Sequence, residues 1–202
     1  MKIVVLSNDV LKEELGDSQN IAWVESLHDF IQHKDADAFM DLQFENTTER
    51  IELLKQLLPK PVIINSVIET LKETNESFIR INAWPAFLKS NIIEASAAEE
   101  KKQMTEEIFN SLNKKIEWLP DQTGFITPRV ICSIINEAFF ALDENVSTKE
   151  EIDTAMKLGT AYPYGPFEWA EKIGLKNIYE LLQKLSKDQP RYAPADLLKQ
   201  SI

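Results

Sequence analysis

Short apolar runs alternate with amphipathic segments over the first half of the chain. The amphipathic segments Thr48–Leu58 and Ala98–Leu112 have apolar residues at helical spacing, so we predict two helices there. Strands alternating with helices are typical of an α/β domain with a mainly parallel sheet. The apolar runs predict seven strands, at Lys2–Leu6, Ile21–Val24, Ala38–Leu42, Val62–Ile64, Phe78–Ile81, Ile92–Ala95 and Ile116–Leu119.

The pattern becomes wholly helical after Pro120. In Thr127–Leu142 the apolar residues recur on one helical face, and Pro128 suits the first helical position behind Thr127 as N-cap. We therefore predict two domains, an α/β domain over 1–119 and an all-α domain over 120–202. The further helices are predicted to begin at a capping box of Ser147-Thr148-Lys149-Glu150 and end near Gly159, to run from Pro166 to Gly174, and to cover Ile178–Leu185 and Ala195–Gln200.

The charge of the chain limits the classes of partner. A formal net charge of −11 and a pI near 4.8 argue against nucleic acid, which needs a basic face, and against an anionic membrane surface. The first apolar run is too short for a secretory signal, and no run approaches the roughly 20 apolar residues of a membrane span. We therefore expect a cytoplasmic globular protein.

Few residues suggest metal or thiol chemistry. Cys132 is the single cysteine, so no disulfide can form within the chain, and its apolar neighbours predict a buried, inert thiol. The two histidines, His28 and His33, lie in an early helical region, where we expect solvated or capping roles. We predict no metal site.

Motifs in the helical half resemble those of the 3-hydroxyacyl-CoA dehydrogenase family. Residues 121–129 read Asp-Gln-Thr-Gly-Phe-Ile-Thr-Pro-Arg and resemble the family's Asp-x-Pro-Gly-Phe-Ile-x-Asn-Arg. Residues 162–168 resemble its Tyr-Pro-x-Gly-Pro-Phe-Glu turn, and residues 152–159 and 191–198 resemble its second helix and terminal segment. In the α/β half, Asp37–Asn46, Ile64–Ser66 and Asn82–Glu94 align with family segments. The resemblance implies that the α/β half, residues 1–119, is a shortened Rossmann-like domain. It also implies NAD-dependent oxidation of a 3-hydroxyacyl thioester, and a helical domain that carries the dimer interface and one wall of the acyl-CoA cleft.

The turn after the first predicted strand departs from a dinucleotide-binding turn. A pyrophosphate needs glycines that let the backbone approach, followed by a helix N-terminus. The glycines of this chain are at 16, 124, 159, 165 and 174, so none lies in that turn, and Asp9 would repel a phosphate. We expect Ser7 to Asp9 to cap a helix and no cofactor to bind. Glu25 is either a remnant of the family's ribose-binding acid or a neighbour of the N-cap Ser26.

The predicted active site departs from the family as well. The resemblance places Asn82 at the catalytic histidine and Glu94 at its glutamate partner, twelve residues apart (94 − 82 = 12). An amide has no basic lone pair near neutral pH, so Asn82 cannot act as general base. Glu94 either bonds Asn82 or is solvated. Pro128 replaces the family's substrate-contacting asparagine, and Ser66 aligns with its serine stretch, as a hydrogen-bond donor or a helix cap.

Three functions remain as hypotheses, in descending order. The first is a catalytically degenerate member that binds acyl-CoA, pairs with itself as a homodimer, or pairs with an active paralogous dehydrogenase. The second is a non-redox enzyme in the same cleft, using Glu94, Ser66 or Asp41. The third is a divergent but active oxidoreductase of fatty-acid metabolism that binds its cofactor in another way.

Overall fold

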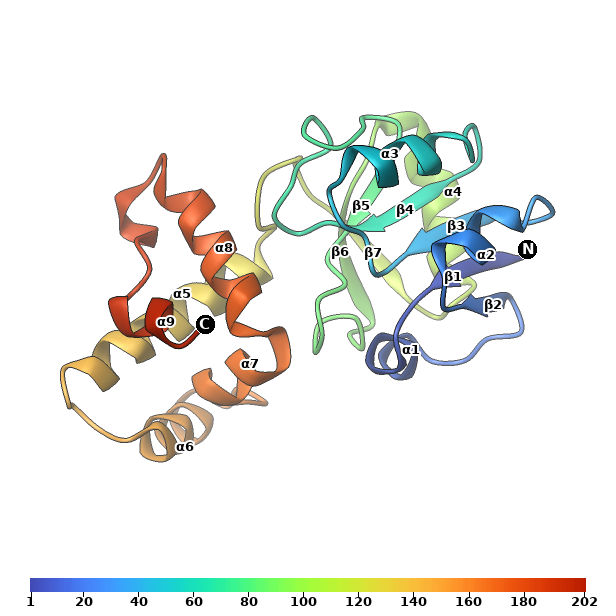
Figure 1. Ribbon diagram of the computed structural model, residues 1–202. Helices are drawn as coiled ribbons and strands as arrows, with labels where there is room; N and C mark the ends of the chain where they lie inside the picture. Colours follow the sequence, from blue (N-terminus) through green and yellow to red (C-terminus); the bar gives the residue numbers. More distant parts are fainter. The chain divides into compact units, whose positions relative to one another are not determined.

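The computed structural model describes residues 1–202, which divide into two compact units. The first unit is Met1–Phe125 and the second is Ile126–Ile202. The division falls shortly after Pro120, where the hydrophobic pattern changes. Figure 1 labels the strands and helices of the first unit and the helices of the second.

A seven-stranded sheet forms the centre of the first unit. Every predicted strand is present, with ends that differ from the prediction by about one residue at most. The sheet order is β2-β1-β3-β4-β5-β6-β7 (Figure 1). The strands are β1 (Ile3–Leu6), β2 (Ile21–Val24), β3 (Ala38–Asp41), β4 (Val62–Asn65), β5 (Ile79–Ile81), β6 (Ile92–Ser96) and β7 (Lys115–Trp118).

The strand directions divide the sheet into two parts. Strands β1 to β5 are parallel, whereas β6 runs antiparallel to β5 and parallel to β7. The chain leaves β1 toward β2 and then returns past β1 to β3, so a topological switch point lies between β1 and β3. Ligands of open α/β sheets bind outside the carboxyl ends of the strands at such a point. The helices of this unit are α1 (Asp9–Leu15), α2 (Leu27–Gln32), α3 (Thr48–Lys55) and α4 (Glu99–Asn110).

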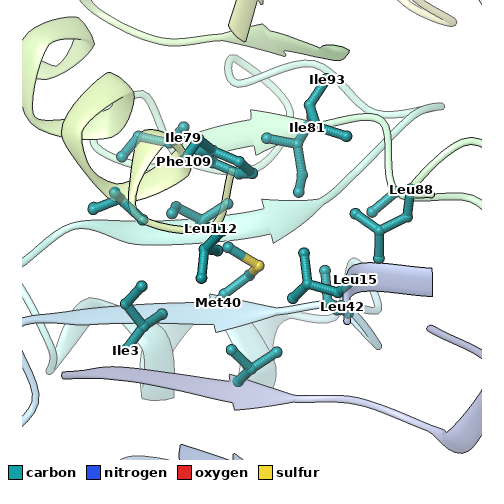
Figure 2. Packing of buried hydrophobic residues seen from close by; sticks show 14 of the residues in the cluster. Ile3, Leu15, Met40, Leu42, Ile79, Ile81, Leu88, Ile93, Phe109 and Leu112 are labelled. Atoms are coloured by element: carbon teal, nitrogen blue, oxygen red, sulfur yellow. The ribbon is translucent and has the colours of Figure 1, made fainter. Parts of the chain in front are cut away.

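Both faces of the sheet are covered. Ile3 and Val5 of β1 point into one core cluster with residues of α1 and α4, and Figure 2 shows this cluster around Met40. Val4 and Leu6 point into the opposite cluster with residues of α2 and α3. Because side chains alternate along a strand, a strand buried on both faces must be apolar at every position, as β1 is.

The second unit is entirely helical. Its long helix α5 buries Ile135 and Phe139, and α8 buries Ile178 and Leu181, which fits the predicted apolar stripes. The α/β and all-α fold classes predicted for the two halves are therefore confirmed. No helix in either unit is long and apolar enough to cross a membrane. The helices are α5 (Thr127–Asp143), α6 (Lys149–Thr160), α7 (Pro166–Ile173), α8 (Leu175–Ser186) and α9 (Asp196–Gln200), with a 3₁₀ turn at Pro190–Tyr192.

Several predicted helix ends were wrong by one to three residues. The largest differences are the end of α3, at Lys55 rather than Leu58, and the start of α8, at Leu175 rather than Ile178. Helix α5 begins at Thr127, so Ile126 rather than Thr127 is its N-cap. The capping box joins Thr148 to Glu151, one residue later than predicted. The segment Ser147-Thr148-Lys149-Glu150-Glu151 allows a capping box from Ser147 to Glu150 or from Thr148 to Glu151, and the structure has the second. Gly159 lies inside α6, and the left-handed residue that ends this helix is Ala161 (φ 55°).

The start of α7 depends on a buried carboxylate from α6. Asp153 accepts hydrogen bonds from the backbone N–H groups of Phe167 (2.8 Å) and Glu168 (3.2 Å). A Cβ atom on Gly165 would lie 2.3 Å from Asp153 Oδ1, so this position requires glycine for space. The side chain of Asp153 therefore replaces the missing N-cap side chain of α7.

Candidate functional site

The turn from β1 to α1 is closed by side chains. Asn8 is the N-cap of α1, and its side-chain oxygen accepts a hydrogen bond from Leu11 N at 2.9 Å. The predicted capping role of this turn is confirmed. Asp9 places a carboxylate in the first turn of the same helix. The Leu11 N–H of the helix is thus already bonded to Asn8, and the carboxylate of Asp9 lies in the same turn. The turn also has no glycine that would let a ligand approach the backbone. These residues do not fit the pyrophosphate of a dinucleotide.

A cavity of about 530 Å³ adjoins this turn at the carboxyl ends of β1 and β2. Glu25 is exposed at the end of β2 and lines the cavity. Ser26 beside it is the N-cap of α2 and accepts a hydrogen bond from Asp29 N at 3.1 Å, so its predicted cap is confirmed. The cavity is lined mainly by polar and charged residues, among them Asp9, Lys12, Glu25 and Asp29, together with Trp23.

Asn82 and Glu94 form a hydrogen-bonded pair on neighbouring strands. The Nδ2 of Asn82 donates to Oε2 of Glu94 at 3.1 Å, and their main chains are joined by Asn82 N to Glu94 O at 2.9 Å. The Oδ1 of Asn82 accepts a weak bond from Trp84 N at 3.4 Å, and Asn82 is only 3% exposed. Of the two roles considered for Glu94, the bond to Asn82 is the one observed. The amide of Asn82 does not titrate, so Glu94 is the single titratable group of the pair.

Asn65 extends this polar network, and its role was not predicted. It ends β4, and its Nδ2 donates to the carbonyls of Leu42 and Ala83, both at 3.2 Å. Its Oδ1 accepts from Ala83 N at 3.0 Å. The segment that follows Asn82 is therefore tied to the ends of β3 and β4. An asparagine directly after an apolar strand was the available sequence signal, because such a residue must satisfy both ends of its amide.

Ser66 is buried and its hydroxyl is already bonded. Oγ of Ser66 donates to the carbonyl of Glu69 at 2.9 Å, and the residue is 2% exposed. No helix lies between β4 and β5, so the alternative of a helix cap was wrong for this residue. Its backbone N–H bonds the carbonyl of Ile81, which places it beside the Asn82–Glu94 pair on the adjacent strand.

Arg80 is a buried charge that the sequence analysis did not identify. It is fully buried in β5, and its Nη1 lies 2.7 Å from Oδ1 of Asp121. The guanidinium also donates to the carbonyls of Ser66, Val67 and Gln122, at 3.0, 3.2 and 3.1 Å. Burial lowers the pKa of Arg80, and Asp121 opposes this shift. A charged residue inside an apolar strand was a usable signal, because it demands a partner.

Asp41, at the end of β3, is paired in the same way. Nε and Nη2 of Arg50 donate to its two carboxylate oxygens at 2.8 and 2.7 Å. Gln43 N adds a third bond at 3.1 Å. Complete burial raises the pKa of Asp41, and the hydrogen bonds from Arg50 oppose the shift. Both oxygens of this carboxylate thus have a protein partner.

The remaining candidate residues lie apart from the Asn82–Glu94 pair or in the second unit. His28 and His33 belong to the α2 region beside β2, and β1, β3 and β4 separate that strand from β5. Pro128 is buried as the second residue of α5. Cys132 is fully buried on the same helix, and burial raises the pKa of its thiol, as the predicted inert role requires.

Comparison with protein families gives one match to the second unit. Residues 124–202 match the family described as "3-hydroxyacyl-CoA dehydrogenase, C-terminal domain". The match begins at Gly124, within the first motif of the helical half, and covers all of α5 to α9. The motifs of the helical half therefore lie almost entirely in the part of the chain that the family model matches.

Relatives extend the similarity to the first unit. The chain is 30% identical to the 3-hydroxyadipyl-CoA dehydrogenase of Escherichia coli K12 over 175 residues, which cover 82% of this chain but 35% of that protein. It is 26% identical to a probable 3-hydroxybutyryl-CoA dehydrogenase of Bacillus subtilis, over 83% of this chain and 64% of that protein. The chain thus spans less than two thirds of each of these relatives.

A solved structure agrees with both units. The (S)-3-hydroxybutyryl-CoA dehydrogenase of Ralstonia eutropha superimposes with a TM-score of 0.72 and 25% identity, over 90% of this chain and 69% of that one. The fold, the ordered motifs and the relatives lead to one assignment. The chain belongs to the 3-hydroxyacyl-CoA dehydrogenase family.

Proposed function

We propose that this family member does not catalyse NAD-dependent oxidation of 3-hydroxyacyl-CoA and instead acts as a binding protein for acyl-CoA or a protein partner. The observation that carries the proposal is the bond between Asn82 and Glu94. Oxidation of a hydroxyl group requires a base that takes its proton, and an amide donating to a carboxylate is not one. Losing a general base typically costs about 10²–10⁴-fold in rate.

The turn between β1 and α1 supports the same proposal independently. Its amide site is capped by Asn8, and Asp9 would oppose a pyrophosphate. Restoring a base alone should therefore not restore activity. This sets the present proposal apart from a simple loss of one catalytic residue.

A non-redox enzyme is less well supported, because its candidate groups are all engaged. Asp41 is bound by Arg50, the Ser66 hydroxyl by Glu69, and Glu94 by Asn82. A general acid or base needs an oxygen that can reach the substrate. A divergent oxidoreductase is supported by the cavity beside Glu25, which is large enough for part of a nucleotide.

The test is an assay of 3-hydroxyacyl-CoA oxidation, monitored as NADH absorbance, for the wild type and Asn82→His. We expect no turnover above background in either, with an active dehydrogenase of the family as positive control. Asn82→Ala is the matched variant, since it removes the bond to Glu94 without supplying a base. Turnover by the wild type, or rescue by Asn82→His but not Asn82→Ala, would contradict the proposal.

Ligand titration then distinguishes the three functions. Tryptophan fluorescence is recorded while NADH, acyl-CoA and CoA are added separately. Saturation by acyl-CoA without NADH supports the binding function, and NADH saturation supports the divergent oxidoreductase. If none of the three ligands changes the fluorescence, binding of a protein partner is the hypothesis that remains. Affinity capture with a paralogous dehydrogenase of the same organism would test it. Turnover of acyl-CoA to another product would establish the non-redox enzyme.

The proposal includes a homodimer formed mainly through the helical unit. Val130 and Phe140 of α5 are 47% and 38% exposed, and Leu158 of α6 is 83% exposed. Exposed apolar side chains of this size are typical of contact surfaces when they are contiguous. Light scattering at micromolar concentration should give twice the 23.2 kDa chain mass, and a monomer would contradict this part. We also propose a cytoplasmic location, consistent with the buried unpaired Cys132 and testable by cell fractionation.

A further inference from the structure

The two edge strands of the sheet differ in how their edges are protected. The sheet order places β2 at one end and β7 at the other. Natural proteins discourage the addition of a further strand with charged residues or proline at an edge. β7 follows this rule, because Lys115 and Glu117 are both exposed along it. β2 reads Ile-Ala-Trp-Val and has neither a charge nor a proline.

The backbone of β2 offers hydrogen-bonding groups on its outer side. Ile3 N donates to the carbonyl of Asn20 at 2.7 Å, and Ser7 N donates to the carbonyl of Val24 at 3.3 Å. Even-numbered residues of this segment therefore face β1. Because successive residues of a strand direct their N–H and C=O groups to opposite sides, those of Trp23 point away from β1. Trp23 is the centre of the free edge.

The side chains of β2 also leave the core incomplete at this edge. Ile21 and Trp23 pack partly buried against the core cluster on one face of the sheet. Ala22 and Val24 pack partly buried against the cluster on the other face. A strand added at β2 would complete the burial of all four side chains, as happens when a peptide extends a sheet.

The charge around this edge selects the kind of strand. The cavity at the carboxyl end of β2 is lined by three carboxylates, from Asp9, Glu25 and Asp29, and by Trp23, against one lysine and one histidine, Lys12 and His33. Nζ of Lys12 lies 5.5 Å from the centroid of the Trp23 ring, so the ring already holds a cation. A second copy of the chain would bring another −11 charge and the same acidic residues to this edge. Charge complementarity therefore favours a basic partner over self-pairing.

We propose that β2 binds an extended, basic and apolar segment of another protein as an added edge strand. The main chain of that segment bonds the outward groups of Trp23, its apolar side chains cover the rims of the two core clusters, and a lysine or arginine enters the cavity beside Glu25. This inference uses neither the Asn82–Glu94 pair nor the ligand proposed above, so it stands or fails separately.

The experiment uses the full chain, labelled with ¹⁵N, and a peptide of about eight residues in which lysine and valine alternate. We expect saturable binding that slows exchange of the Trp23 amide by at least about tenfold, with no such change at β7. A peptide of the same sequence with N-methyl groups along one edge should bind at least about tenfold more weakly, because it cannot donate main-chain hydrogen bonds.

Two protein variants separate the site from general charge attraction. Glu25→Lys should weaken binding by about tenfold, whereas Glu117→Lys, which reverses the same charge at the other edge, should leave it nearly unchanged. Equal binding of the N-methylated peptide, equal loss in both variants, or no binding at millimolar peptide would overturn the proposal. Self-association of the free chain through Trp23 would also overturn it, since a second copy would then be the occupant.

Discussion

Replacing Asp121 by alanine should strongly destabilise the first unit. The substitution removes the carboxylate 2.7 Å from the fully buried Arg80 guanidinium, and leaves that charge without a counter-ion. Breaking a buried pair in this way costs about 3–5 kcal/mol. Asp121 also accepts hydrogen bonds from Leu71 N at 2.9 and 3.1 Å, and losing them adds to the cost.

The exposure of Asp121 places the expected cost near the lower end of that range. Its side chain is 23% exposed, so water can enter the vacated position and solvate part of the guanidinium. We therefore expect a loss of about 3 kcal/mol in the free energy of unfolding, a large fraction of the 5–15 kcal/mol typical of a domain.

Urea unfolding followed by tryptophan fluorescence measures this loss. Three of the four tryptophans, Trp23, Trp84 and Trp118, lie in the first unit, so the signal reports mainly on that unit. The matched control is Glu52→Ala, which breaks the exposed pair Lys55–Glu52 at 2.6 Å and should cost under about 1 kcal/mol. If Asp121→Ala and Glu52→Ala were equally stable, the Arg80 network would not be holding this part of the fold.

Three further predictions concern the second unit. Gly165→Ala should cost about 1–3 kcal/mol in thermal or urea unfolding, since its Cβ would meet Asp153 at 2.3 Å, whereas Gly159→Ala, with open space and a helical backbone, should be neutral or stabilising. Cys132 should resist thiol reagents in the folded chain and react only on unfolding; rapid labelling under native conditions would be inconsistent with its burial. The hydrogen bond from Lys157 of α6 lowers the pKa of Glu168. The stability that this bond contributes is therefore fully present above the ordinary glutamate pKa and is lost as the pH falls through the lowered value. Helix melting monitored by circular dichroism should show this acid loss in the wild type, and a smaller one in Glu168→Gln.

The sequence predicted the candidate site only in part, for a physical reason. Asn82 and Glu94 were identified through the resemblance to the family, and the hydrogen bond between them follows from two adjacent strands bringing them together. Ser66 was identified too, but its bond to Glu69 depends on the irregular path from β4 to β5, which carries no periodic signal. Arg80 was missed because its partners Asp121 and Gln122 lie about forty residues away.

Hydrophobic periodicity by itself determined where the strands and helices of this protein form. Apolar runs and amphipathic stripes are local, so the seven strands and the helices were predicted to within a few residues. Residue identity alone also established that the turn after β1 contains no glycine and that Asn82 cannot act as a general base. Tertiary structure decided which strand lies at an edge, because strand order depends on packing between distant segments. It likewise chose the register of the capping box at Thr148, the pairing of Arg80 with Asp121, and the exposed edge at Trp23.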